Sequence, residues 1–298
     1  MTQIPARHTI PSGLITLADH EQHARTQLDD NAWAYFSGGA ADEISLRANR
    51  SAWDALPLWP RVLRPLAGGH TRVPLLGRTL AHPILLAPVA FQRLAHPDGE
   101  LAMAYAAAAL GAGVVLSTQA SVSLESVAQA VLPDPGRGPL WFQLYLQPDR
   151  GVTQALVQRA ESAGYEALVL TVDAPTSGVR DRERRAGFRL PPGVGPVNLA
   201  GLQAPASPPL SPGQSALFDG LLHHAPTWED IAWLQSITRL PVLLKGVLHP
   251  ADARQAVSVG AAGLIVSNHG GRTLDTAPAT VTALPRVVQA VGGAVPVL

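Results

Sequence analysis

The stretch GAAGLIVSNHGGRTLD at residues 260–275 decides the fold, because it joins an apolar run to a cluster of polar side chains. The run GLIV has the length and composition of a strand buried on both faces. His269, Arg272 and Asp275 follow it, interleaved with two glycines. Polar groups at the carboxyl end of a buried strand are typical of the parallel sheet of an α/β protein, where binding sites form at that end.

The same pattern recurs along the chain, since short apolar runs alternate with turns and alanine-rich helical segments. Together the predicted strands are PILLAP (83–88), GVVLST (113–118), WFQLYL (141–146), ALVLTVD (167–173), PVLLKGV (241–247), GLIVSNHG (263–270) and VPVL (295–298). Helical patterning at 149–164 and 249–261 separates neighbouring strands. Runs that are apolar on both faces and alternate with helices predict a parallel sheet covered by helices.

Two architectures contain such a sheet, the (β/α) barrel and the doubly wound open sheet. The barrel is favoured, because polar side chains follow nearly every strand and no G-x-G-x-x-G turn follows any of them. We therefore predict one α/β domain over residues 1–298, a TIM (β/α)8-type barrel with about seven strands. Residues 1–80 are predicted to be a lead-in segment with helical patterning, and residues 190–226 a long proline-rich loop between the fourth and fifth strands.

Composition and charge narrow the class of partner. Lys plus Arg equals Asp plus Glu at 22 each, so the sequence has no electrostatic footprint for nucleic acid or an anionic membrane. The absence of cysteine excludes disulfides, thiolate metal sites and cysteine nucleophiles. The start of the sequence lacks the apolar core of a signal peptide. The apolar stretch 101–116 is too short for a membrane span, and its pattern predicts a helix followed by a strand. We expect a cytoplasmic protein with a small-molecule partner.

Two pairs of histidines and one turn are interpreted as structural features without a role in a functional site. HEQH at 20–23 differs in spacing from the zinc-binding H-E-x-x-H, and HH at 223–224 falls in the long loop, so no metal site is predicted. AHPDGE at 95–100 indicates a turn and a helix start, with Asp98 as the N-cap.

In a barrel the ends of the strands converge on one mouth, so the polar groups there become neighbours. These groups are Ser117, Thr118, Gln143, Tyr145, Thr171, Asp173, Lys245, Ser267, Asn268, His269 and Arg272. His269 is the candidate general base, because histidine titrates near neutral pH, and Asp173 is suited to hold its imidazolium.

Three cations are candidate site residues, and two of them admit more than one interpretation. Arg272 and Arg180 are suited to gripping a carboxylate, but Arg180 begins the mixed-charge run RDRERRAGFR (180–189), and such runs are usually solvated. Lys245 ends an apolar strand, where it can form a Schiff base or hold an anionic cofactor ring. Spacing alone leaves both roles of Lys245 open.

The collected segments resemble the FMN-dependent family that oxidises 2-hydroxy acids, which includes glycolate oxidase, lactate oxidase, lactate monooxygenase, mandelate dehydrogenase and the flavin domain of flavocytochrome b2. The resemblance covers essentially the whole chain. Its segments, in the family's order, are AYFSGGAADE, NRSAWDALPLWPRVLR, PILLAPVAFQRLAHPDGE, LSTQAS, WFQLYLQPDR, RAESAGYEALVLTVDAP, LPVLLKGVLHPADA and GAAGLIVSNHGGRTLD. The segments S-N-H-G-G-R and L-T-V-D-x-P are its most specific parts.

The resemblance implies roles for individual residues. Tyr35 and Tyr145 match substrate-binding tyrosines, Arg180 and Arg272 match the carboxylate-binding arginines, and His269 matches the catalytic base with Asp173 as its partner. Flavin contacts fall on Pro88, Val89, Ala90, Ser117, Gln143, Thr171 and Lys245. Lys245 would then stabilise negative charge near the flavin N1 and C2 carbonyl, so no Schiff base is needed. The expected reaction is oxidation of a small, lactate-like L-2-hydroxy acid to the 2-oxo acid by a homo-oligomer, a tetramer in the family.

Departures from the family bear on substrate and cofactor. Val89 stands where the family often has threonine, and Gln119 stands where plant glycolate oxidases have tryptophan, so glycolate is not the expected substrate. The family continues past PVL into two FMN-phosphate loops and an eighth strand, and from this we expect a chain that lacks its C-terminal end, with the eighth βα unit missing. Two alternatives stay open: an FMN-free, inactive fragment or paralogue, and a non-enzymatic subunit whose barrel another chain completes.

Overall fold

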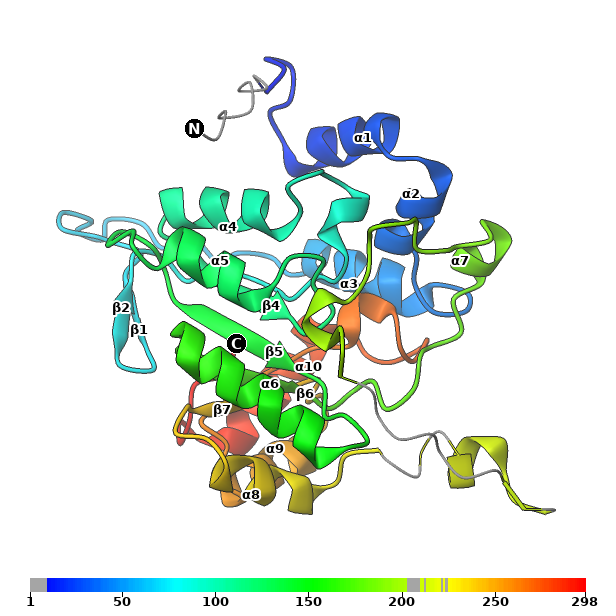
Figure 1. Cartoon of the computed structure of the whole chain (residues 1–298). Coiled ribbons are helices and arrows are strands. Elements are labelled where there is room, and N and C mark those ends of the chain that lie inside the picture. The colour runs from blue at the N-terminus through cyan, green and yellow to red at the C-terminus, as the bar shows by residue number, and fades with distance from the viewer. Residues whose placement is uncertain (1–9, 203–209, 212, 221, 223–224) are drawn as a thin grey trace.

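Six parallel strands carry the fold in the computed structural model, which describes residues 10–202, 210–211, 213–220, 222 and 225–298. Each strand pairs with the next one along the chain, in the order β3 (Leu85–Leu86), β4 (Gly113–Ser117), β5 (Leu140–Leu144), β6 (Ala167–Thr171), β7 (Val242–Lys245) and β8 (Gly263–Ile265). The sheet curls as part of a (β/α) barrel, with helices around its outside (Figure 1). The predicted parallel sheet and barrel architecture are therefore confirmed.

The last predicted strand is present as a single parallel bridge between Val297 and Leu264. Leu264 donates its N–H to the Pro296 carbonyl at 2.9 Å, and Leu298 donates to the Leu264 carbonyl at 2.8 Å. Residues 296–298 therefore continue the sheet beyond β8 in the predicted direction, over a shorter length than the sequence suggested.

The connecting helices pack on the outer face of the sheet. They are α4 (Glu100–Ala109), α5 (Leu124–Val131), α6 (Arg150–Ala163), α8 (Trp228–Ser236), α9 (Pro250–Ser258) and α10 (Thr280–Val291). The apolar stretch 101–116 is α4 followed by β4, as predicted. The predicted Asp98 N-cap is wrong, because the cap position is Gly99, whose positive φ of 51° suits glycine better than aspartate.

Side chains alternate between two apolar layers along each strand, as strand geometry requires. Phe142 and Leu168 face the helices in the outer core. Trp141 and Val169 face the barrel interior, where they join a smaller inner core with Val115, Ala167 and Leu243. All five of these inner residues are at most 3% exposed. The inner face of the sheet is therefore apolar, and Val115 and Trp141 also line a cavity of about 480 Å³ on this face.

The lead-in contains helices, as predicted, and also a hairpin that the sequence did not predict. The helices are α1 (Leu17–Gln27), α2 (Asp30–Ser37) and α3 (Ile44–Asp54). The hairpin joins β1 (Val73–Leu75) to β2 (Arg78–Leu80) through Leu76 and Gly77, whose φ angles are 45° and 79°. Leu75 and Leu76 pack against the inner core, so the hairpin covers the amino-terminal end of the barrel interior.

The long loop 190–226 connects β6 to β7, between the fourth and fifth strands of the sheet as predicted. Before it, α7 (Asp181–Arg185) follows β6, and within it lie the short turns η2 (Val197–Leu199) and η3 (Ala216–Gly220). Residues 203–209, 212, 221 and 223–224 of the loop, with its two adjacent histidines, lie outside the described residues, as do residues 1–9.

Within the part of the chain that the structure describes, no helix is long and apolar enough to cross a membrane.

An ion-pair cluster fixes the hairpin to the sheet. Arg78 donates from one guanidinium nitrogen to both Glu166 oxygens at 2.8 Å, and Arg137 donates to Glu166 Oε1 at 2.6 Å. Burial acts to raise the pKa of Glu166, but the two arginines outweigh it and hold that pKa below its usual 4.5.

We expect Glu166→Gln to lower the free energy of unfolding by about 1 kcal/mol at pH 7. A depressed carboxyl pKa contributes stability that is present above the usual pKa and is lost as pH falls through the folded-state pKa. The difference between the wild-type and variant proteins in urea unfolding should therefore shrink below pH 4.5. Glu125→Gln, which breaks a more exposed pair with Arg159, is the control and should cost about 0.5 kcal/mol or less. A difference for Glu166→Gln that does not change with pH would contradict this account.

Candidate active site

A cavity of about 460 Å³ opens where the carboxyl ends of the strands meet. It forms because the inward-facing positions change from apolar to polar at the strand ends: Trp141 is followed by Gln143 and Tyr145, and Val169 by Thr171. All but one of the residues to which the family resemblance gives a role line it: Tyr35, Pro88, Val89, Ala90, Ser117, Gln143, Tyr145, Thr171, Arg180, Lys245, His269 and Arg272. The exception, Asp173, stands behind His269 and contacts its ring.

Four neighbouring strands supply a row of polar groups along the base of the cavity. The strand register pairs Ser117 with Gln143 and Thr171 with Lys245. The Gln143 amide donates to the Thr171 hydroxyl at 2.9 Å, and its oxygen accepts from the Thr118 N–H at 3.1 Å. The row is therefore held by hydrogen bonds before any ligand arrives.

Lys245 is a buried cation, with only 7% of its surface exposed. Desolvation lowers its pKa, and the nearby Asp173 carboxylate partly opposes that shift. A buried ammonium that lines a cavity is stabilised when an electron-rich group of a ligand lies against it.

His269 is held between an acid and a phenol. Its Nδ1 lies 2.9 Å from Asp173 Oδ1, and its Nε2 lies 3.4 Å from the Tyr145 hydroxyl. A carboxylate only accepts hydrogen bonds, so Nδ1 carries the proton of a neutral ring and Nε2 carries the lone pair. Nε2 is thus a proton acceptor at the cavity wall, and Asp173 is positioned to stabilise the imidazolium that forms when it is protonated.

Burial keeps the two tyrosines protonated. Desolvation, helped by the charge of Asp173, raises the pKa of Tyr145 to about 12. Desolvation also raises the pKa of Tyr35, although the nearby Arg272 opposes the shift. Both phenols are therefore hydrogen-bond donors at neutral pH.

The loop that carries His269 has an unusual backbone. His269, Gly270 and Gly271 have φ angles of 58°, 65° and 71°. A Cβ at Gly271 would lie 2.6 Å from the Leu46 backbone nitrogen, so only glycine lets the loop approach α3 this closely. The positive φ of His269 is strained for a residue with a side chain, and such strain is common at functional sites.

Two amides lock this loop to the lead-in. Asn268 donates to Asn49 Oδ1 at 2.8 Å, and Asn49 donates back to Asn268 Oδ1 at 2.9 Å. Asn268 also accepts from the Gly271 N–H at 3.1 Å. Asn268 and Thr118 were collected as site residues from the sequence, but both are buried outside the cavity and have a structural role.

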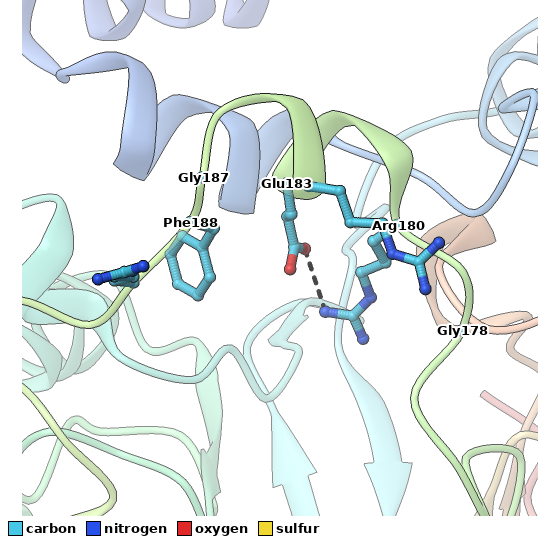
Figure 2. A pocket seen from close by; sticks show the side chains of 7 residues that line it. Gly178, Arg180, Glu183, Gly187 and Phe188 are labelled. Carbon is cyan, nitrogen blue, oxygen red and sulfur yellow. Dashed lines mark hydrogen bonds and ion pairs between the residues drawn. The ribbon is translucent and has the colours of Figure 1, made fainter.

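The two predicted arginines lie together, at 17% and 21% side-chain exposure for Arg272 and Arg180. Arg272 donates to the carbonyls of Tyr35 and Gly38 at 2.5 and 2.7 Å, and its guanidinium lies 5.0 Å from the centre of the Tyr35 ring. Arg180 bonds to Glu183 (Figure 2). Desolvation, followed by repulsion from Arg180, lowers the pKa of Arg272, so the pair favours a ligand that brings negative charge.

Sequence reasoning missed three contributors. Glu183 accepts hydrogen bonds from both arginines. Its i,i+3 spacing from Arg180 on a helical run was a usable signal for the ion pair between those two residues. Asn49 and Gly246 act through contacts with residues distant in sequence, and no local pattern marks them.

Comparisons with known proteins all point to the same family. The sequence pattern of the FMN-dependent dehydrogenases matches residues 24–298. An L-lactate oxidase from Roseobacter sp. is 51% identical over 288 residues, which are 96% of this chain and 76% of that protein. A glycolate oxidase from Arabidopsis thaliana is 42% identical over 95% of this chain and 76% of its own. The chain thus spans about three quarters of the length of these relatives.

Solved structures agree with the sequence relatives. A mandelate oxidase variant with (S)-mandelic acid superposes with a TM-score of 0.83 at 42% identity, over 95% of this chain and 76% of that one. A second structure of a variant of the same enzyme, with a C4a-OH-FMN adduct, has a TM-score of 0.81, also at 42% identity, over 94% of this chain and 76% of that one.

A substitution at Gly246 tests how closely the site is packed around Asp173. Its φ is 110°, and a Cβ there would overlap the side chain of Asp173. We expect Gly246→Ala to lower the free energy of unfolding by about 3 kcal/mol, from backbone strain and overpacking together. Gly260→Ala is the matched control: its φ is 80° but the nearest atom is 3.6 Å away, so about 1 kcal/mol is expected. Equal costs in urea unfolding would show that contact between Gly246 and Asp173 is unimportant.

Proposed function

Because the chain belongs to the FMN-dependent dehydrogenase family, we propose that its cavity oxidises a small L-2-hydroxy acid such as L-lactate to the 2-oxo acid, with FMN as the electron acceptor. The observation that carries the proposal is the position of His269. Its Nδ1 is bound to Asp173, and its Nε2 faces a cavity that also contains two arginines and two tyrosines.

The base of the cavity fits the flavin ring. The ring presents carbonyl oxygens and nitrogens along one edge, and the cavity offers the Ser117 and Thr171 hydroxyls, the Gln143 amide and the Lys245 ammonium in one row. Residues 88–90 line the same space. Lys245 would hold the electron-rich part of the ring, which matches its burial. FMN, when bound, accepts the electron pair that leaves the substrate carbon.

The other groups act on the substrate. Arg180 and Arg272 bind its carboxylate, because two partly buried guanidinium groups take an anion in a defined orientation. Tyr35 and Tyr145, both protonated, donate hydrogen bonds to its oxygens. His269 takes a proton from the substrate at Nε2, and Asp173 stabilises the resulting imidazolium.

The substrate side chain would meet a largely apolar wall. Val89, Phe91 and Phe188 line the cavity with Gln119, and Phe188 stacks on Tyr35 with ring centres 4.9 Å apart. Because apolar side chains contribute most of this wall, we propose a 2-hydroxy acid with a small apolar side chain, such as L-lactate, over glycolate.

We further propose that the chain forms a homo-oligomer. A run of large apolar side chains lies on its surface, each 52–99% exposed: Leu56, Leu58, Trp59, Val62, Leu63 and Leu66. Exposed apolar patches of this kind often mark protein–protein contacts. Light scattering should give a mass that is a multiple of 31.2 kDa, and Trp59→Glu with Leu63→Glu should reduce it. A monomer at micromolar concentration would contradict the proposal.

The proposed chemistry is tested by His269→Gln. We expect the FMN-loaded wild-type protein to lose its visible flavin absorption on anaerobic addition of L-lactate. The variant should be about 10²- to 10⁴-fold slower in stopped-flow measurements, the usual contribution of a general base. His20→Gln, an exposed histidine on α1, is the control and should react at the wild-type rate. Equal rates for His269→Gln and the wild-type protein would exclude His269 as the base.

A further inference from the structure

The two substrate-binding arginines differ in how they are held. Arg272 is anchored by the carbonyls of Tyr35 and Gly38 and by the Tyr35 ring, in addition to its bond to Glu183. Arg180 bonds to Glu183 Oε1 at 3.2 Å, and its Nε is buried without a hydrogen-bond partner among the described residues. Arg180 is therefore the less constrained of the pair.

Glu183 connects the loose arginine to the fixed one. The same oxygen, Oε1, accepts from Arg180 Nη1 at 3.2 Å and from Arg272 Nη2 at 3.1 Å. Glu183 is only 14% exposed, and its helix is held to the lead-in by contacts from Arg182 to Ser37 and Glu43. A largely shielded carboxylate between two guanidinium groups offsets their mutual repulsion and fixes their separation.

Glu183 also stands in the wall of the site. A second hollow of about 410 Å³ is lined by residues of this segment (Figure 2), and Arg180, Glu183 and Phe188 line both it and the site cavity. Because Arg180 lines both hollows, its side chain would have space in either of them without its bond to Glu183. The structure shows no other described group that holds Arg180 toward the substrate side.

We propose that Glu183 is a positioning residue that tethers Arg180 to Arg272, so that the substrate carboxylate meets two guanidinium groups at a fixed spacing. This inference rests on the proposed function, since it takes the two arginines as the carboxylate clamp. Glu183 acts on affinity for the carboxylate through the arginines and takes no part in proton transfer at His269.

Whether loss of Glu183 weakens or strengthens binding of an anion distinguishes a positioning role from a purely electrostatic one. Removing the Glu183 charge makes the site more positive, which by itself strengthens binding of an anion. Loss of the tether has the opposite effect, because Arg180 must then be ordered when the ligand binds. Glu183→Gln keeps an oxygen that both arginines can share, whereas Glu183→Ala removes it.

The experiment measures oxalate binding to the FMN-loaded chain from the change in the flavin spectrum, which requires no turnover. We expect Glu183→Ala to weaken oxalate binding and to raise KM for L-lactate at least tenfold, with kcat changed less than threefold. Glu183→Gln should stay within threefold of the wild-type protein. Asp181→Ala is the matched control, since this acidic residue of the same helix pairs with Arg184 and lies outside the cavity lining.

Three results would overturn the inference. Oxalate binding that is unchanged or tighter in Glu183→Ala would show that no tether is needed. Equal weakening in Glu183→Ala and Glu183→Gln would show that the shared oxygen is not what matters. A wild-type protein that takes up FMN but binds no oxalate would contradict the proposed function together with the inference, whereas the first two results leave the proposed function intact.

Discussion

The alternation of side chains along parallel strands is the constraint on which the rest of the structure depends. Inward-facing positions are apolar through the middle of the barrel, as at Trp141, Val169 and Leu243. Two residues farther along each strand, the same inward positions are Gln143, Thr171 and Lys245. Because all six strands run in one direction, these changes occur at one level and create one polar cavity above an apolar interior.

The cavity is completed by contacts that bring remote segments together. The loop after β8 lies against α3 because Gly271 allows a close backbone approach and because Asn268 and Asn49 exchange hydrogen bonds. Gly246, at the end of β7, leaves room for Asp173 from the end of β6. Arg272 in turn binds carbonyls of the lead-in. The lead-in is therefore part of the site, since it supplies Tyr35 and holds the segment that carries His269.

The sequence was sufficient for the strands and for most of the cavity, because both follow from short-range patterns. Buried runs predicted the sheet, and the polar residues after them predicted Gln143, Lys245 and His269 as neighbours. Three features depend on approach between distant segments and have no local signal: the glycine at 246, the amide pair at Asn49 and the hairpin at 73–80. Glu183 was hidden for a different reason. Its run, RDRERRAGFR, has the composition of a solvated surface, and only the fold shows that two of its charged residues, Arg180 and Glu183, face inward while Arg184 stays exposed.

The central claim is that one cavity at the strand ends holds both the flavin ring and the carboxylate of a 2-hydroxy acid. A crystal structure of the protein grown with FMN and oxalate tests it most directly. The account predicts a planar ring against Gln143, Thr171 and Lys245, with oxalate between His269 and the pair Arg180 and Arg272. An FMN ring bound elsewhere, or oxalate bound away from both arginines, would contradict it.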